Sequence, residues 1–192
     1  MTAPTLIRRL SRADGITLTA VLLVVQAFWW LGQGEPELAA ALACVSMFLD
    51  YVDGAVARRW GSSAYGRVLD SLYDVLGWVL FPAAVINLRL EWTWWSLVVT
   101  SLFCLAGLLR LSRFTVEGYS GESEPHYVGL PVLFSQYALL AAFIWPPSAA
   151  LMLAVMVPLM VSERRFRKPP PVLSYLLLVY GAVFGWRFVI QA

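Results

Sequence analysis

Aspartate is scarce in this 192-residue chain, and four of its five aspartates fall within one short stretch. Asp50 and Asp53 are three residues apart, and Asp70 and Asp74 are four apart, which places each pair on one face of a helix. The segment 60–64 between the pairs contains Gly and Ser and is typical of a turn. Because such a turn folds one helix back beside the other, we expect the two pairs of carboxylates to face each other.

Carboxylates gathered in this way repel one another unless cations neutralise them. Their hard oxygen ligands suit Mg²⁺ or Mn²⁺, and the sequence contains no cluster of Cys or His for a softer metal. Two divalent ions about 4 Å apart clamp a diphosphate and stabilise charge on both its attacking and its leaving oxygens. The aspartates therefore predict a site for two divalent cations that handles a diphosphate.

Small residues accompany the aspartates. Gly54, Ala57 and Gly66 lie next to them or one helical turn away, and they leave a groove where a base and a diphosphate approach the helix backbone closely. Arg58 follows on the same helix, and its planar guanidinium is well suited to phosphate oxygens. The pattern therefore favours a nucleotide as part of the substrate.

The elements that carry these residues are predicted to be membrane helices. Hydrophobic residues make up 60% of the chain and charged residues only 14%, against about 25% charged in a soluble domain. The apolar residues come in blocks long enough to cross a bilayer as helices. We expect an all-α integral membrane protein with one catalytic domain over 1–192. A basic amphipathic surface helix is predicted at 3–12, and seven spans at about 15–31, 37–59, 65–88, 92–113, 129–145, 148–162 and 172–190.

The basic residues predict the orientation of these spans. With the N-terminus in the cytoplasm, Arg89 and Arg187 lie outside and all other basic side chains lie inside, the bias expected of cytoplasmic loops. The inside set is Arg8, Arg9, Arg12, Arg58, Arg59, Arg67, Arg110, Arg113, Arg164, Arg165, Arg167 and Lys168. The four clustered aspartates then lie near the cytoplasmic face. A carboxylate at membrane depth costs about 2.5–3.5 kcal/mol on insertion scales, and a bound cation removes that cost.

The stretch from Asp50 to Asp74 resembles the signature of the CDP-alcohol phosphotransferase family, Asp-x-x-Asp-Gly-x-x-Ala-Arg followed by Gly-x-x-x-Asp-x-x-x-Asp. The resemblance implies a six-helix membrane core, two bound divalent cations, a homodimer and an active site open to the cytoplasm. It also implies transfer of a phosphatidyl-type group from a CDP-linked lipid to a small alcohol, with release of CMP. No nucleic-acid partner is expected.

The resemblance also assigns roles. Asp50, Asp53 and Asp70 would bind metal, and Asp74 would share in this and act as general base on the acceptor hydroxyl. A larger set would contact the nucleotide or phosphate: Gly54, Ala57, Arg58, Ser63, Gly66, Thr17 and Asp14. For Asp14 a simpler interpretation is that it caps the first helix.

Within the family, three segments are most similar to phosphatidylserine synthases: Leu69–Asp74, Leu109–Phe114 and Tyr127–Pro131. L-Serine is therefore the expected acceptor, with glycerol-3-phosphate, inositol phosphate or another polyol as the alternative. Arg110 and Arg113 are candidates to bind the serine carboxylate, although basic side chains at a helix end also serve only to set topology.

Two other functions use intramembrane aspartates. A membrane prenyltransferase also holds Mg²⁺-diphosphate between Asp pairs, but the Gly-x-x-Ala-Arg segment favours a nucleotide. A cation transporter places carboxylates near the middle of the membrane, whereas the aspartates here are predicted near one face.

Overall fold

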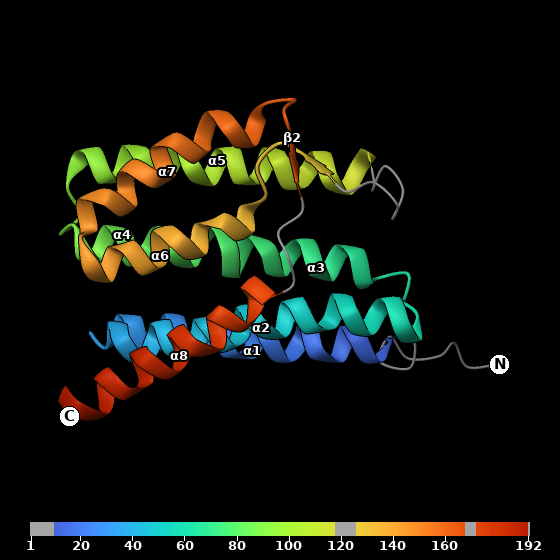
Figure 1. Cartoon of the computed structure of the whole chain (residues 1–192), viewed down its shortest axis with the longest axis horizontal. Helices are drawn as coiled ribbons and strands as arrows, with labels where there is room; N and C mark the ends of the chain where they lie inside the picture. The colour runs from blue at the N-terminus through green and yellow to red at the C-terminus, as the bar shows by residue number, and fades with distance from the viewer. Residues whose placement is uncertain (1–9, 118–125, 168–171, 192) are drawn as a thin grey trace. The chain divides into compact units, whose positions relative to one another are not determined.

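The computed structural model describes residues 10–117, 126–167 and 172–191, and these residues are almost entirely helical (Figure 1). The α-helices are α1 (Arg12–Gly32), α2 (Pro36–Trp60), α3 (Gly66–Asp74), α4 (Phe81–Arg89), α5 (Trp94–Glu117), α6 (Ser135–Ile144), α7 (Pro146–Val161) and α8 (Val172–Gln191). A π-helix, η2 (Val75–Leu80), joins α3 to α4, and a 3₁₀ turn, η3 (Val132–Phe134), precedes α6. Two short strands, β1 (His126–Val128) and β2 (Arg165–Arg167), form an antiparallel ribbon.

Among the described residues, four segments are long and apolar enough to cross a membrane: Arg12–Gly32, Pro36–Trp60, Gly66–Arg89 and Trp94–Val116. Three apolar helices are shorter: Val132–Ile144, Pro146–Val161 and Tyr175–Gln191. The all-α membrane fold is thus confirmed. Seven helical segments match the seven predicted ones in order, while the membrane crossing of the three shorter ones and the single domain over 1–192 stay predictions.

The chain divides into two compact units, and the first comprises residues up to Tyr73 together with those from Ser174 onward. In this unit α1 and α2 form a hairpin whose turn includes Gly34, which adopts a φ of +83° that favours glycine. Ser46 Oγ on α2 donates a hydrogen bond to the Ala20 carbonyl on α1 at 2.7 Å. Helix α8 approaches α2 closely at Gly181, where a Cβ would lie 3.3 Å from the Ala41 oxygen.

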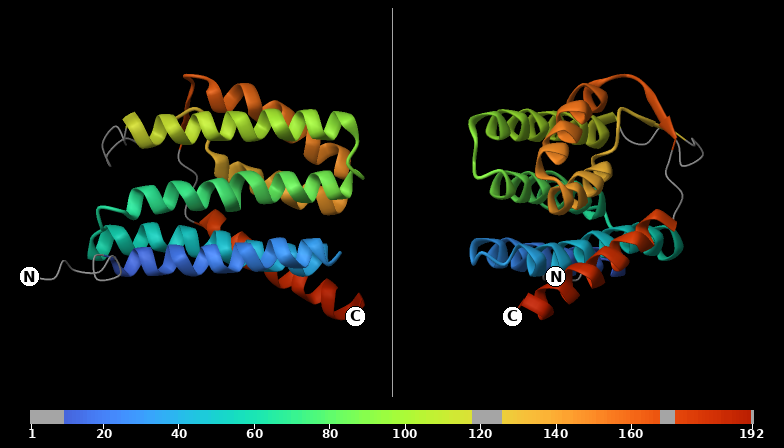
Figure 2. Two further views of the ribbon diagram at one scale, coloured as in Figure 1. Left: turned by 180° about the vertical axis from the view of Figure 1, so that it is seen from behind. Right: turned by 60° about the vertical axis from the view of Figure 1, so that its left-hand side comes forward.

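The second unit, Asp74–Leu173, contains η2, α4, α5, α6 and α7. Within it, α4 and α5 are antiparallel neighbours joined by a tight turn (Figure 2), and Asn87 donates to Thr100 Oγ1 across them at 2.8 Å. Helix α7 lies along α5 and α6 lies along α4 (Figure 1). The core consists of large apolar side chains, among them Trp78, Phe81, Phe103, Leu139 and Leu153.

The predicted helix at 129–145 is wrong in its first part, since α6 begins only at Ser135. Gly129 takes a left-handed φ of +74°, and a Cβ there would lie 2.5 Å from the Met160 carbonyl oxygen. Its N–H donates to the Arg164 carbonyl at 2.9 Å, which ties the segment to the residues after α7. This pairing between distant segments replaces the local helix that the apolar composition favoured.

Two further boundaries differ from the predictions. Most of the predicted surface helix at 3–12 falls on residues 1–9, outside the described part, and Arg12 already begins α1. Helix α5 continues to Glu117, so Arg110 and Arg113 lie within the helix and not at its end.

Candidate metal centre

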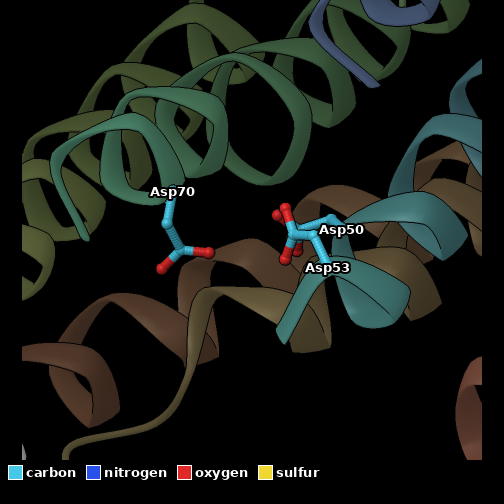
Figure 3. Close-up of side chains that lie close together, drawn as sticks. All are labelled: Asp50, Asp53 and Asp70. Carbon is cyan, nitrogen blue, oxygen red and sulfur yellow. The ribbon is translucent and has the colours of Figure 1, made fainter. Parts of the chain in front are cut away.

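Three of the predicted metal ligands lie together in the first unit. Asp50 and Asp53 project from α2, and Asp70 projects toward them from α3 (Figure 3). One carboxylate oxygen from each of the three lies within 4.8 Å of the other two. Asp53 is buried and the other two are half-buried. The spacing of three residues on α2 and the turn before α3 therefore bring the carboxylates together, as the sequence predicts.

The spacing and chemistry of this group fit a divalent cation. Ligands on one octahedral Mg²⁺ are about 3.0 Å apart when adjacent and about 4.2 Å apart when opposite, because each Mg–O bond is about 2.1 Å. The carboxylate oxygens lie within 4.8 Å of one another, close to this range, and a shared ion would draw them together. Three carboxylates this close in a half-buried position repel one another, and a cation that they bind removes this cost. All the ligand atoms are hard oxygens, which suits Mg²⁺ or Mn²⁺.

Thr17 on α1 holds one of these carboxylates. Its hydroxyl donates a hydrogen bond to Asp53 Oδ2, and it also lies 3.2 Å from the Ala13 carbonyl one turn earlier on α1. Both Thr17 and Asp53 are buried. The Thr17 hydroxyl thus orients a carboxylate of the aspartate group. The nucleotide contact predicted for Thr17 stays a prediction.

Helix α3 is anchored by a residue that the sequence analysis missed. Tyr73, fully buried and three residues after Asp70, forms a 2.9 Å hydrogen bond with Ser46 Oγ on α2. Ser46 in turn donates to the Ala20 carbonyl on α1. This chain of contacts fixes the rotation of α3 and so the direction of Asp70. The position of Tyr73 between two motif aspartates could have indicated its importance, but the sequence does not show that Ser46 is its partner.

Asp14 has a structural role at the start of α1. Ser11 is the N-cap of the helix, and Asp14 accepts a 2.6 Å hydrogen bond from the Ser11 N–H in a capping box. The interpretation of Asp14 as the N-cap itself is therefore wrong. Its Oδ1 would lie only 3.0 Å from a Cβ at Gly66, so Gly66 lets α3 begin against Asp14. A nucleotide contact by either residue stays a prediction.

The remaining predicted nucleotide contacts lie along the ends of α2 and α3. At Gly54 a Cβ would meet only Arg58 Nη1, at 3.5 Å, among the described atoms, so the exposed Arg58 side chain lies beside an open stretch of helix. Ala57 is half-buried, and its carbonyl accepts from the Gly61 N–H at the helix end. Ser63 Oγ accepts from the N–H groups of residues 65 and 66, which caps α3.

Comparison with known families identifies the chain. The sequence profile of the family described as CDP-alcohol phosphatidyltransferase matches residues 10–186, which is most of the chain and includes all three clustered aspartates. The chain belongs to the CDP-alcohol phosphatidyltransferase family. Membership confirms the family resemblance that the aspartate motif indicated.

Three relatives illustrate what the chain is similar to. It is 32% identical to archaetidylserine synthase of Methanothermobacter thermautotrophicus over 139 residues, covering 68% of this chain and 58% of the relative. It is 33% identical to CDP-diacylglycerol–serine O-phosphatidyltransferase of Methanocaldococcus jannaschii over 134 residues, covering 68% and 64%. It is 26% identical to CDP-diacylglycerol–glycerol-3-phosphate 3-phosphatidyltransferase of Escherichia coli over 141 residues, covering 69% and 76%. The chain thus spans roughly three fifths of the length of the two serine-directed relatives.

The other predicted site residues of this family member belong to the second unit. Asp74 ends α3 one turn after Asp70, and among the described residues it is not part of the three-carboxylate group. Arg110 is buried on α5, with its guanidinium 5.7 Å from the Phe114 ring centre and 5.8 Å from that of Tyr127. Arg113 is half-buried, and its Nη1 lies 3.5 Å from the Ser162 carbonyl oxygen. Their roles in catalysis and acceptor binding stay predictions.

Proposed function

We propose that this chain transfers a phosphatidyl-type group from a CDP-linked lipid, CDP-diacylglycerol or its archaeal equivalent, to a small alcohol, with L-serine as the acceptor. The observation that carries the proposal is the group of Asp50, Asp53 and Asp70 in a chain whose family profile spans 10–186. The apolar helices keep the lipid tails of donor and product in the bilayer.

The aspartate group is the proposed binding site for the diphosphate of the donor. Asp50, Asp53 and Asp70, with Asp74 as a further candidate, would hold two divalent cations, Mg²⁺ or Mn²⁺. Bound there, such ions neutralise the diphosphate and make CMP a better leaving group. Arg58 beside Gly54 is placed to pair with phosphate oxygens, and the open backbone at Gly54 leaves room for the nucleotide.

The chemical step is a displacement at the phosphorus that carries the lipid. The acceptor oxygen forms a bond to that phosphorus, and the bond to the CMP oxygen breaks, so that CMP leaves with the electron pair. Asp74 takes the proton from the acceptor hydroxyl. Asp74 suits this role because it lies one turn beyond the metal-binding group on the same helix.

Serine adds a carboxylate that must lose its water near the membrane, and this is costly without a cationic partner. Arg110 is the stronger candidate for that partner, because it is buried and its guanidinium is held between two aromatic rings. The two serine-directed relatives support this acceptor. Glycerol-3-phosphate is the alternative that the Escherichia coli relative represents, and inositol phosphate is a further one.

We further propose that the chain lies in the cytoplasmic membrane with its N-terminus and active site on the cytoplasmic side, and that it forms a homodimer. Twelve of its fourteen basic side chains fall on the cytoplasmic side in this orientation, which supports it. The homodimer rests on the family resemblance.

The decisive experiment uses the full chain in nanodiscs. The protein is incubated with CDP-diacylglycerol or its archaeal counterpart and with L-serine, glycerol-3-phosphate or inositol phosphate, and the lipid product is identified by mass spectrometry. We expect phosphatidylserine-type lipid and CMP, both abolished by chelation of divalent ions. Each of Asp50→Asn, Asp53→Asn, Asp70→Asn and Asp74→Asn should remove most turnover.

Glu37→Gln is the matched control, because Glu37 is an acidic residue in the first turn of α2, at the opposite end from the aspartate group. It should leave turnover unchanged. If any two of the four Asn variants keep near-normal rates with Mg²⁺ present, the metal site is misassigned. A product made only from another acceptor would refute serine but not the transfer reaction.

A further inference from the structure

The helix that carries Asp74 changes its winding immediately after this residue. Residues Val75–Leu80 form a π-helix, in which the Phe81 N–H donates to the Leu76 carbonyl five residues before. A π-turn inserts one residue relative to an α-helix and is frequent at functional sites. The rotation of Asp74 relative to α4 therefore depends on this segment being held in place.

A hydroxyl from α6 holds one side of the π-helix. Ser135 Oγ donates to the Trp78 carbonyl, which lies within η2, at 2.6 Å, and both Ser135 and Trp78 are buried. The first residue of α6 thus bonds directly to the backbone of the π-helix.

Helix α5 holds the other side. A Cβ at Gly107 would lie 2.9 Å from Val79 Cγ2 and 3.1 Å from Val79 Cγ1, so the two helices touch where a glycine meets the π-helix. Helices α4 and α5 are antiparallel neighbours (Figure 2), so residues after Gly107 run back toward Asp74. With a rise of about 1.5 Å per residue, Arg110 is about 4.5 Å beyond this contact and Asp74 about 7.5 Å beyond it in the same direction.

We propose that Gly107, Val79 and Ser135 are positioning residues that clamp the π-helix and so fix Arg110 and Asp74 at one level for a single acceptor molecule. The proposal rests on the proposed function, in which Asp74 takes the acceptor proton and Arg110 binds the acceptor anion. The clamp lies entirely within the second unit. Because Arg110 is proposed to bind only the acceptor, we expect loss of the clamp to raise the Michaelis constant for the acceptor much more than that for the CDP-lipid.

The clamp is tested by enlarging the side chain at Gly107 and shrinking the one at Val79, first separately and then together. In Gly107→Ala the new methyl group must move about 0.5–1 Å to reach an ordinary carbon–carbon distance. A displacement of that size at a reacting group costs up to about 100-fold in rate. Because the displaced Arg110 also binds the acceptor in the proposed function, we expect the KM for the acceptor to rise 10-fold or more and the KM for CDP-lipid to change much less. Val79→Ala removes both γ-carbons, and the double variant Gly107→Ala/Val79→Ala should recover most of the loss.

The control for helix propensity is Gly32→Ala, since a Cβ there meets no described atom within 4 Å. Equal rises in both KM values for Gly107→Ala, or no recovery in the double variant, would overturn the clamp.

The hydrogen bond from Ser135 to the Trp78 carbonyl allows an independent test of the clamp. Ser135→Ala should raise the acceptor KM, while Ser135→Thr, which keeps the hydroxyl, should restore it. Ser148→Ala, which removes a hydroxyl bonded to the Trp145 carbonyl in an exposed position, should change nothing. A Ser135→Ala enzyme with an unchanged acceptor KM would contradict the proposal.

All constants are measured with whichever acceptor the wild-type chain uses. A different acceptor alone therefore refutes the serine assignment without touching the clamp. The variants could also lower the melting temperature without raising the acceptor KM above the CDP-lipid KM. These residues would then serve only the stability of the fold, and the clamp would be refuted.

Discussion

Thr17→Val removes the hydroxyl that donates to Asp53 while keeping the size and branching of the side chain. A hydrogen bond to a charged group contributes about 1.5–3 kcal/mol, and each 1.4 kcal/mol is a factor of ten. Removing a group that orients a metal ligand typically lowers metal affinity by about 10–100-fold, which is the same range. We expect CMP release to need about 10–100-fold more Mg²⁺ or Mn²⁺ for half-maximal rate, with the maximal rate largely regained at saturating metal.

Thr19→Val is the matched control, because Thr19 lies on the same helix, is exposed and bonds only the Gly15 carbonyl among the contacts described. The assay is a titration of metal at fixed CDP-lipid and acceptor in nanodiscs, with melting temperatures recorded in parallel. An unchanged metal requirement in Thr17→Val would refute the role of this hydroxyl in orienting Asp53. A loss of rate that excess metal does not restore, without a loss of folding, would place Thr17 on the nucleotide instead.

Gly66→Ala should reduce the free energy of unfolding by about 1–3 kcal/mol and lower the melting temperature, since its Cβ would lie 3.0 Å from Asp14 Oδ1. An unchanged melting curve would contradict this. Gly54→Leu should abolish CDP affinity, measured by calorimetry, while the protein still folds; unchanged affinity would show that the nucleotide does not lie there. Arg110→Gln should raise the serine KM about 10–100-fold through loss of a charged hydrogen bond, with Arg113→Gln weaker because that residue is less buried. If both variants leave the serine dependence untouched, the acceptor assignment fails.

Much of the fold follows from local patterns in the sequence. Apolar blocks of membrane-crossing length give α1, α2, α5 and the joined helix from Gly66 to Arg89. The turn at 60–64 was also predicted from its Gly and Ser residues, and Gly61 there adopts a φ of +87°. The β1–β2 ribbon was not, since three-residue strands gain their stability from a partner far along the chain. Gly129 is where the chain departs from a helix, and its left-handed φ and its hydrogen bond to the Arg164 carbonyl depend on that distant segment.

The candidate site was predicted as far as spacing along a helix determines it. Asp50, Asp53 and Asp70 come together because spacings of three residues and a short turn leave few other arrangements. The partners that hold them belong to tertiary structure. Thr17 reaches Asp53 from another helix, and the hydroxyl of Tyr73 finds Ser46 on α2. A single sequence contains these residues but does not show which distant side chains they contact.

The second half of the aspartate motif combines two positions with different surroundings. Asp70 belongs to the group of three carboxylates, and the Tyr73 anchor fixes its helix against α2. Asp74 directly precedes the π-helix and is not among the three clustered ligands in the described part of the chain. A carboxylate bound to a cation is a poor proton acceptor, because the cation favours its charged form. A general base is better placed next to the metal group than inside it. Both roles that the motif assigns to Asp74, proton transfer and a share in metal binding, therefore stay predictions, and its place one turn beyond Asp70 is compatible with the first.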